Sequence, residues 1–291
     1  MHAHFGVDGI YAMAFAKRLG APLAVSFYGY DVSRLPAPRL IPISHLHYYL
    51  SYRQLGEYAS LLIAYTQYLA ERLIEIGMPP EKIRVHYVGI SVQDLSLEIP
   101  NAARPKNVLF VGRFVEKKGL AHLVSAFRLV AQQVPGTKLF LVGDGPLRAE
   151  LERRVDELGL GDRVHFVGRV PHSSLRDWYG QTVVFTHPSV TTAAGETEGL
   201  PFSILEAQAA GLPVVATRHA GIPEGVVHER TGLLVREGSV EEIAQALLLL
   251  LRDDDRRDVM AREAVAFMHE RFEVHECTRT LENLYDEISA L

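Results

Sequence analysis

Residues 195–217 constrain this chain more than any other stretch, because their glycines and prolines fix an order of elements. The short apolar run at residues 183–187 predicts a buried strand, and a loop of small and polar residues follows it. Pro201 favours the first turn of a helix, since its missing N–H would have no partner there in any case. Gly211 is placed to end that helix, and residues 213–217 predict the next strand. Strand, loop, helix and strand in this order indicate a parallel sheet.

Two glutamates flank the predicted start of this helix. Glu198 lies in the loop and Glu206 on the helix, with seven residues between them. A free helix N-terminus favours a phosphate group, and carboxylates accept hydrogen bonds from sugar hydroxyls. Taken alone, such a pair is also compatible with two solvated carboxylates on a surface helix.

In its full context this stretch resembles the Glu–seven residues–Glu signature of retaining glycosyltransferases of family four. The resemblance implies an α/β chain with the GT-B architecture, in which two Rossmann-like domains with parallel sheets face each other. It also implies roles for single residues. Glu198 would contact the donor sugar, Glu206 would hold the ribose of the nucleotide, and the backbone at Gly199 and Leu200 would approach the diphosphate.

A basic loop follows the predicted strand at residues 107–112. It starts at Gly112 and carries the separated cations Arg113 and Lys118. Arginine binds phosphate oxygens in a fork, and lysine supplies a point charge. The alternative is a solvated basic loop. By resemblance, Arg113 and Lys118 would neutralise the diphosphate leaving group.

Two further turns belong to the same predicted domain. Gly143 opens a Gly-Asp-Gly-Pro turn after a strand, and Arg169 and Val170 follow the next strand. A glycine turn is weak evidence alone because such turns are common. In context, the resemblance implies that Gly143 lies beside the nucleotide and that the backbone of Arg169 and Val170 faces the base.

The beginning of the chain resembles the middle of the family's first domain. The sequence His-Ala-His-Phe-Gly at residues 2–6 matches a family element in which His4 would lie close to the reacting sugar. The alternative is a strand-end histidine with ordinary hydrogen bonds. A family member has two or three strands and a glycine-rich acceptor loop before this point, and none is found upstream of His2. We therefore expect an incomplete first domain, either truncated or remodelled, which bears on the acceptor site.

The composition of the linker and the family pattern together divide the chain. Residues 1–103 are expected to form a truncated N-terminal, acceptor-side domain. Residues 104–270 are expected to form the C-terminal domain that binds the nucleotide-sugar donor. Residues 271–291 are expected to form a helix that returns to the first domain.

The amino-acid composition limits the classes of partner and the location that we expect. The net charge of −5 argues against nucleic acid as the main partner. The single cysteine, Cys277, fits a reducing cytosol, and no apolar run reaches the ~20 residues of a membrane span. Neither His2 with His4 nor His45 with His47 has acidic or thiol neighbours at metal-ligand spacing. We expect no metal, because the basic loop already covers the diphosphate, and a cytoplasmic location with peripheral contact at the inner membrane face.

The expected function is transfer of a sugar, with retention, from a nucleoside-diphosphate sugar such as a UDP or GDP sugar. The acceptor would be a glycan or a lipid-linked glycan in polysaccharide assembly. Two alternatives stay open: a nucleotide-sugar-binding protein without transferase activity, and a GT-B-type epimerase, for which only Asp8 and Asp31 lie in suitable loops of the first domain. A nicotinamide oxidoreductase ranks last, because the chain lacks a clean Gly-any-Gly-any-any-Gly turn followed by an acidic residue.

Overall fold

A computed structural model describes residues 1–33, 35, 45–97 and 101–289 of the chain. The chain divides into two compact units. Unit 1 contains residues 1–89, 192–200 and 274–291, and unit 2 contains residues 90–191 and 201–273.

Unit 1 is built on a parallel sheet in the order β1-β2-β3-β4. Its strands are β1 (His2–His4), β2 (Ala24–Phe27), β3 (Leu61–Ala64) and β4 (Ile83–Val85). Its helices are α1 (Gly6–Leu19), α2 (Leu46–Tyr58), α3 (Gln67–Glu75), the short 3₁₀ turn η2 (Pro80–Lys82) and α12 (Val274–Ser289).

Alternation along the strands gives the sheet of unit 1 two apolar faces, as expected for parallel strands covered on both sides. Ala24, Leu61 and Ile63 pack against Leu284 and Ile288 of α12. On the helix, the buried Leu284 and Ile288 and the partly buried Leu281 and Tyr285 recur at helical spacing, so α12 is amphipathic. Against the other face, α1 approaches closely at Gly9, where a Cβ atom would meet side chains of β2 and α2 at 2.9–3.2 Å.

Unit 2 is built on a six-stranded parallel sheet in the order β10-β9-β8-β5-β6-β7. Its strands are β5 (Val108–Val111), β6 (Leu139–Val142), β7 (Val164–Gly168), β8 (Val184–His187), β9 (Val214–Thr217) and β10 (Gly232–Val235). Its α-helices are α4 (Val92–Leu95), α5 (Leu120–Gln133), α6 (Arg148–Glu157), α7 (Leu175–Gly180), α8 (Phe202–Ala209), α9 (Ile222–Gly225), α10 (Val240–Arg252) and α11 (Asp254–Arg271). Short 3₁₀ turns are η3 (Asn101–Ala103), η4 (Glu116–Lys118) and η5 (His172–Ser174).

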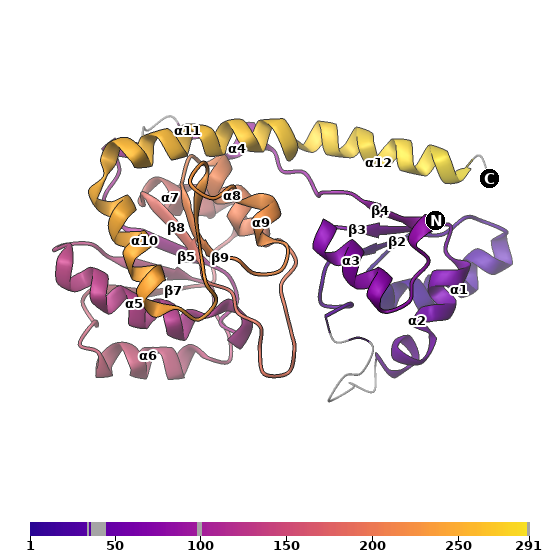
Figure 1. The fold of residues 1–291 in the computed structure, drawn as a ribbon, viewed down its shortest axis with the longest axis horizontal. Coiled ribbons are helices and arrows are strands. Elements are labelled where there is room, and N and C mark those ends of the chain that lie inside the picture. The colour runs from indigo at the N-terminus through magenta and orange to yellow at the C-terminus, as the bar shows by residue number, and fades with distance from the viewer. Residues whose placement is uncertain (34, 36–44, 98–100, 290–291) are drawn as a thin grey trace. The chain divides into compact units, whose positions relative to one another are not determined.

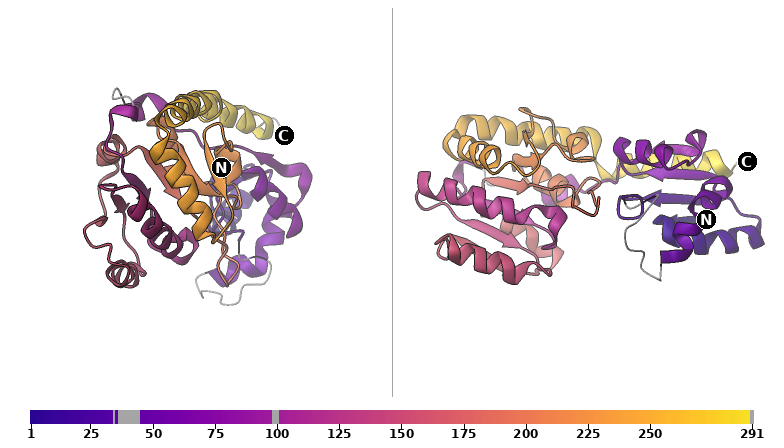
Figure 2. Two further views of the ribbon diagram at one scale, coloured as in Figure 1. Left: turned by 60° about the vertical axis from the view of Figure 1, so that its left-hand side comes forward. Right: turned by 60° about the horizontal axis from the view of Figure 1, so that its bottom comes forward.

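The sheet of unit 2 has a hydrophobic cluster on each face. Val108 and Phe110 of β5 pack with α5, α6 and α10 in one cluster, and Leu109 packs with α7, α8 and α9 in the other. Figure 1 shows these two sets of helices on opposite sides of the strands, and the same layers are visible from two further directions in Figure 2. The two parallel sheets confirm the α/β class and the two Rossmann-like sheets predicted from the sequence.

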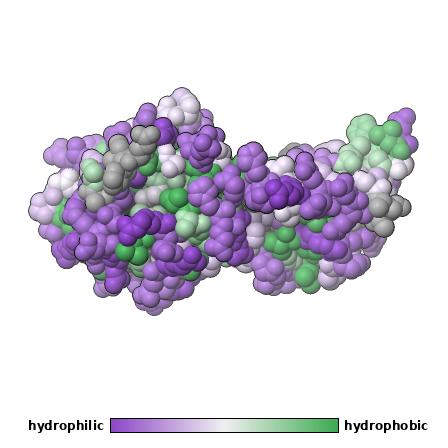
Figure 3. Space-filling view, turned by 90° about the horizontal axis from the view of Figure 1, so that it is seen from above, coloured by the Kyte–Doolittle hydropathy of each residue, from purple (hydrophilic) through white to green (hydrophobic). Residues whose placement is uncertain are grey.

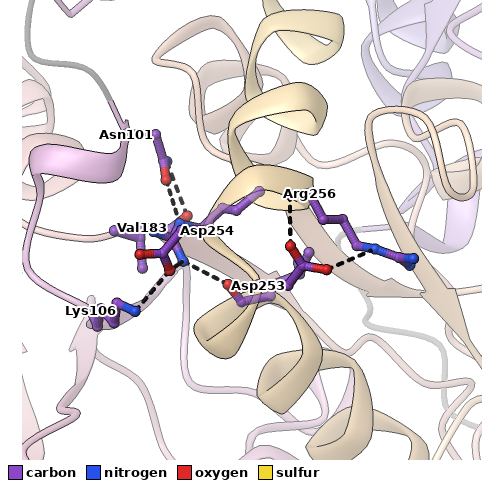
Figure 4. Close-up of polar contacts among 8 residues, drawn as sticks. Asn101, Lys106, Val183, Asp253, Asp254 and Arg256 are labelled. Carbon is purple, nitrogen blue, oxygen red and sulfur yellow. Dashed lines mark hydrogen bonds and ion pairs between the residues drawn. The ribbon is translucent and has the colours of Figure 1, made fainter.

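A polar network ties the start of unit 2 to α11 (Figure 4). Asn101 donates from its amide to the carbonyl oxygens of Val183 and Gly211, both at 3.1 Å. Its Oδ1 accepts a hydrogen bond of 2.6 Å from the fully buried Arg257. Arg257 also pairs with Asp254, which Lys106 contacts at 2.7 Å. A buried guanidinium is stable only with such partners.

Across the described ranges, no helix combines the length and apolarity needed to cross a membrane. The surface visible in Figure 3 is mostly hydrophilic, with smaller hydrophobic areas.

Candidate functional site

The connectivity of unit 2 points to the carboxyl ends of β5 and β8. The chain runs from β5 outward to β6 and β7, then returns to the other side of β5 with β8. In open parallel sheets the loops diverge at such a reversal, and ligands bind there. The loops that follow β5 and β8 carry the residues singled out in the sequence.

The basic loop after β5 is held firmly. η4 places Lys118 next to Gly119, which has a left-handed backbone with φ of 65°. The Nζ atom of Lys118 lies 3.4 Å from Nε2 of His187, the last residue of β8. Arg113 is exposed and Lys118 is half-buried. Two cations thus lie on one short loop at the reversal of the sheet, as the sequence predicts.

Gly112 and Gly143 meet at their backbones. A Cβ atom on Gly143 would lie 1.9 Å from the carbonyl oxygen of Gly112, so only glycine fits there. The amide of Gly112 donates to Val142 at 3.0 Å, and the amide of Gly143 donates to Gly168 at 2.8 Å. The turns after β5, β6 and β7 therefore form one backbone surface without side chains at these points.

Glu206 is held by two residues that the sequence analysis missed. The hydroxyl of Tyr179 donates to Oε2 at 3.0 Å, and Nε2 of His172 lies 2.8 Å from Oε1. Burial, and then the negative charge of Glu206, raise the pKa of Tyr179 well above its usual value, so this hydroxyl remains a donor. The side chain of Glu206 is only 12% exposed, and its carboxylate is fixed in orientation.

Arg169 and Val170 directly follow β7, as expected. The side chain of Arg169 is exposed, and Val170 packs against the cluster of α7, α8 and α9. They therefore lead into η5, which carries the His172 that contacts Glu206.

The remaining predicted residues belong to unit 1. Nδ1 of His4 lies 2.6 Å from the hydroxyl of Tyr28. The loop at residues 192–200 packs beside them, because a Cβ atom on Gly199 would lie 2.7 Å from the carbonyl oxygen of Tyr28. Glu198 and Leu200 are buried, at 7% and 3% exposure. Tyr28 thus contacts His4 through its hydroxyl and lies against the loop of Glu198, Gly199 and Leu200 through its backbone.

A cavity of about 180 Å³ in unit 1 has His2 and His4 in its wall. His2 contacts the Tyr285 hydroxyl at 2.6 Å and the Ser26 hydroxyl at 2.9 Å. Burial, and then the neighbouring His4, lower the pKa of His2 to about 4. The imidazole is neutral at pH 7 and links β1 to α12. Among the described residues, no group of three or more His, Cys, Asp or Glu side chains is placed to hold a metal ion.

His187, Tyr179 and His172 are the residues that sequence reasoning missed. His187 gives one local signal, since it is a polar residue that ends an apolar strand directly before Pro188. Tyr179 and His172 lie 27 and 34 residues from Glu206 in the sequence, so no local pattern predicts their contacts with it.

Comparisons with known proteins agree over most of the chain. The family described as "Glycosyl transferases group 1" matches residues 94–266, and "Glycosyltransferase Family 4" matches residues 1–94. The chain is 32% identical over 289 residues to the amylovoran biosynthesis glycosyltransferase AmsK of Erwinia amylovora, covering 98% of this chain and 69% of that protein. It is 34% identical over 249 residues to the putative colanic acid biosynthesis glycosyltransferase WcaL of Escherichia coli K12, covering 84% of this chain and 59% of the relative.

Solved structures show the same fold. The crystal structure of Anabaena Alr3699/HepE in complex with UDP matches with a TM-score of 0.83 and 22% identity. The match covers 98% of this chain and 78% of that one. At this identity the similarity establishes the fold, which is the predicted GT-B architecture with two Rossmann-like domains.

Proposed function

Because the chain belongs to the group 1 glycosyl transferases, we propose that it transfers a sugar from a nucleoside-diphosphate sugar to a glycan or lipid-linked acceptor. The match to family four confirms the resemblance seen in the sequence. Retention of the anomeric configuration is part of the proposal. A role in polysaccharide assembly is supported by the relatives AmsK and WcaL, whose names place them in amylovoran and colanic acid biosynthesis.

The observation that carries the proposal is the basic loop at the reversal of the sheet in unit 2. Arg113 and Lys118 stand on one loop at the carboxyl end of β5. Negative charge develops on a diphosphate as it leaves the sugar, and cations held in place before the reaction stabilise that charge most effectively. Glycine at position 143 lets the turns after β5 and β6 pack backbone to backbone, which fixes the main chain from which the two cations project.

The other residues of unit 2 would each bind a different part of the nucleotide-sugar donor. Glu206, fixed by Tyr179, would accept hydrogen bonds from the ribose hydroxyls. The backbone of Arg169 and Val170 would face the base. UDP in the HepE crystal structure supports a nucleoside diphosphate as the ligand of this fold.

His4 and the loop of unit 1 would serve the transferred sugar. Glu198 would accept from a sugar hydroxyl, and the backbone of Gly199 and Leu200 would approach the diphosphate. His4, held by Tyr28, would present its other ring nitrogen to the donor sugar.

The remaining predictions are carried forward as parts of the proposal. The domains divide at residues 103–104 and 270–271, no metal is required, and the protein works in the cytoplasm with peripheral contact at the inner membrane face. Adding EDTA is therefore expected to leave activity unchanged.

The chain spans 59% of WcaL and 69% of AmsK. The alternative of a nucleotide-sugar-binding protein without transfer is separated from a transferase by the assay below. The epimerase alternative is weaker. The carboxylate of Asp31 accepts hydrogen bonds from the amides of Gly6 and Gly29 and is 4% exposed, so it is engaged in holding the backbone.

Calorimetric titration with UDP, GDP and ADP, followed by an assay of donor hydrolysis and transfer, tests the proposal. Removing one preorganised charge, as in Lys118→Met, is expected to lower kcat by about 100- to 1000-fold. The matched control is Lys138→Met, because Lys138 is exposed and precedes β6 at the opposite end of the strand. Binding without hydrolysis or transfer would favour the alternative. If no nucleoside diphosphate binds, or if Lys118→Met and Glu198→Ala keep full activity, the proposal is wrong.

A further inference from the structure

His187 lies under the basic loop, and neither the family pattern nor the proposed function assigns it a task. It is the last residue of β8 and is fully buried. Its ring lies 5.4 Å from that of Phe110 and 6.4 Å from that of Phe185, measured between centroids. A leucine would fill such an apolar site without the cost of burying two ring nitrogens.

Both ring nitrogens of His187 have polar neighbours. Nδ1 lies 2.9 Å from the hydroxyl oxygen of Ser189, and Nε2 lies 3.4 Å from Nζ of Lys118. An ammonium group donates and never accepts, so the Nε2 atom that faces it must carry no proton. The ring proton is then on Nδ1, where it is donated to Ser189. The neighbours thus select one neutral tautomer.

The two loops are also joined through their backbones. The amide of Val190 donates to the carbonyl oxygen of Lys117 at 2.9 Å. Gly119 packs directly on Pro188, since a Cβ atom there would lie 1.9 Å from the Pro188 carbonyl oxygen. These contacts fix the main chain of the basic loop against the end of β8, with the long side chain of Lys118 reaching the ring of His187.

A further hydrogen bond holds the Ser189 residue that contacts His187. The hydroxyl of Thr217 at the end of β9 donates to the carbonyl oxygen of Ser189 at 2.6 Å. The acceptor for Lys118 therefore rests on β8 and β9 together, which are rigid elements of the six-stranded sheet.

We propose that His187 is a positioning residue, whose neutral imidazole accepts from the Lys118 ammonium and directs it to the diphosphate that the proposed function places there. A lysine side chain has many rotamers, and an anchored ammonium loses less entropy when the ligand binds. Burial and the adjacent Lys118 lower the pKa of His187 well below its usual value, with smaller contributions from His219 and Lys117. The ring therefore does not compete with Lys118 as a second cation.

A nuclear magnetic resonance experiment tests the contact without any ligand. In protein labelled with ¹⁵N-histidine, long-range ¹H–¹⁵N spectra distinguish the two tautomers. We expect His187 to carry its proton on Nδ1 and to keep this spectrum from pH 8 down to pH 6. A proton on Nε2, or protonation with a midpoint near 6.5, would overturn the inference.

The affinity for UDP or GDP, whichever the wild type binds more tightly, tests whether His187 positions Lys118 for the diphosphate. His187→Leu is expected to weaken binding about tenfold, the typical effect of losing a hydrogen bond to a charged group. His187→Gln places a carbonyl oxygen near the position of Nε2 and is expected to stay within about threefold of wild type. His165→Leu is the control, because His165 also stacks on a phenylalanine but lies on β7, away from Lys118.

A double-mutant cycle separates positioning from packing. In a Lys118→Met background, His187→Leu is expected to weaken binding no further than about twofold, because its effect passes through Lys118. If the two losses multiply, or if the Gln and Leu variants are equally impaired, His187 is only a core residue. These results leave the proposed function intact, whereas a wild-type protein that binds no nucleoside diphosphate defeats the proposed function itself.

Discussion

The two units hold the loops at the carboxyl ends of their strands by different means. In unit 2, backbone meets backbone at glycines, as where Gly143 meets Gly112 and Gly119 meets Pro188. In unit 1, an ionisable side chain holds the loop after β2. The carboxylate of Asp31 accepts from the amides of Gly6, Tyr28 and Gly29, at 2.8, 3.3 and 3.2 Å.

This difference determines whether a loop contact is sensitive to side-chain volume or to pH. Backbone contacts do not titrate, so these two glycine contacts of unit 2 are sensitive to side-chain volume rather than to pH. In unit 1, burial raises the pKa of Asp31 to about 6, against hydrogen bonds from Gly6 and other amides that lower it. His2 has a lowered pKa of about 4. The comparison teaches that the loop contacts of Asp31 and His2 in unit 1 depend on pH, whereas the glycine contacts of unit 2 depend on side-chain volume, and four substitutions test it.

The largest effect is expected from Gly119→Ala. The new Cβ atom would overlap the carbonyl oxygen of Pro188, and the left-handed backbone adds strain, for a loss of about 4 kcal/mol in the free energy of unfolding. Urea unfolding followed by the fluorescence of Trp178, the only tryptophan and part of unit 2, measures it. Gly136→Ala is the control, since Gly136 also has a positive φ but open space around it, and about 1 kcal/mol is expected. Equal losses would contradict the role of backbone contact.

Asn101→Ala comes next. It removes one acceptor from the buried Arg257 and the donor to two carbonyl oxygens (Figure 4), and we expect a loss of about 3 kcal/mol. The same fluorescence assay applies, with the exposed Asn283→Ala as the control. The hydrogen bonds of Asn101 do not titrate in this range, so a loss that changed strongly between pH 7 and pH 5 would contradict this account.

Asp31→Ala probes unit 1. Three amides lose their acceptor, and we expect a loss of about 2 kcal/mol at pH 7, measured by circular dichroism during urea unfolding. The folded pKa of about 6 is above the unfolded value, so the contribution of this carboxyl is greatest at low pH and falls as pH rises through 6. The gap between wild type and variant should therefore widen below pH 6. The exposed Asp8→Ala should show no such change.

The smallest effect is expected from His2→Gln. The folded pKa of about 4 is below the unfolded value of 6.5, so wild-type stability falls as pH drops from 6.5 towards 4. After allowance for partial exposure, this amounts to about 1 kcal/mol at pH 5. The variant should show a flatter dependence of stability on pH, and the exposed His275→Gln should follow the wild type. If His2→Gln also follows the wild type, the imidazole does not titrate with folding.

Much of the architecture was predictable, because apolar runs and glycine or proline boundaries are local signals. The run at residues 183–187 is β8 from Val184, and the helix that starts after Pro201 is α8, which ends at Ala209, two residues before Gly211. A helix end depends on hydrogen bonds that the last turn shares with the following loop, so single-residue differences are expected there.

The candidate residues were predictable where a motif names them, as for Lys118 and Glu206, although their roles remain predictions. Their partners were not predictable, because His187 and Tyr179 reach them only through the folding of the sheet. Asp31 shows the opposite case. Its loop position suggested acid–base chemistry, whereas its contacts are to the backbone. Sequence position gives residue type and loop, but the direction of a side chain depends on distant parts of the chain.

The division of the chain into units has a practical consequence for protein engineering. The polypeptide passes from one unit to the other after residues 89, 191, 200 and 273. A chimaera that takes its whole first unit from a homologue must therefore transplant three separate gene segments, including the nine codons for residues 192–200. A fusion joined at a single breakpoint would combine a loop from one parent with the strands against which the other parent's loop evolved to pack.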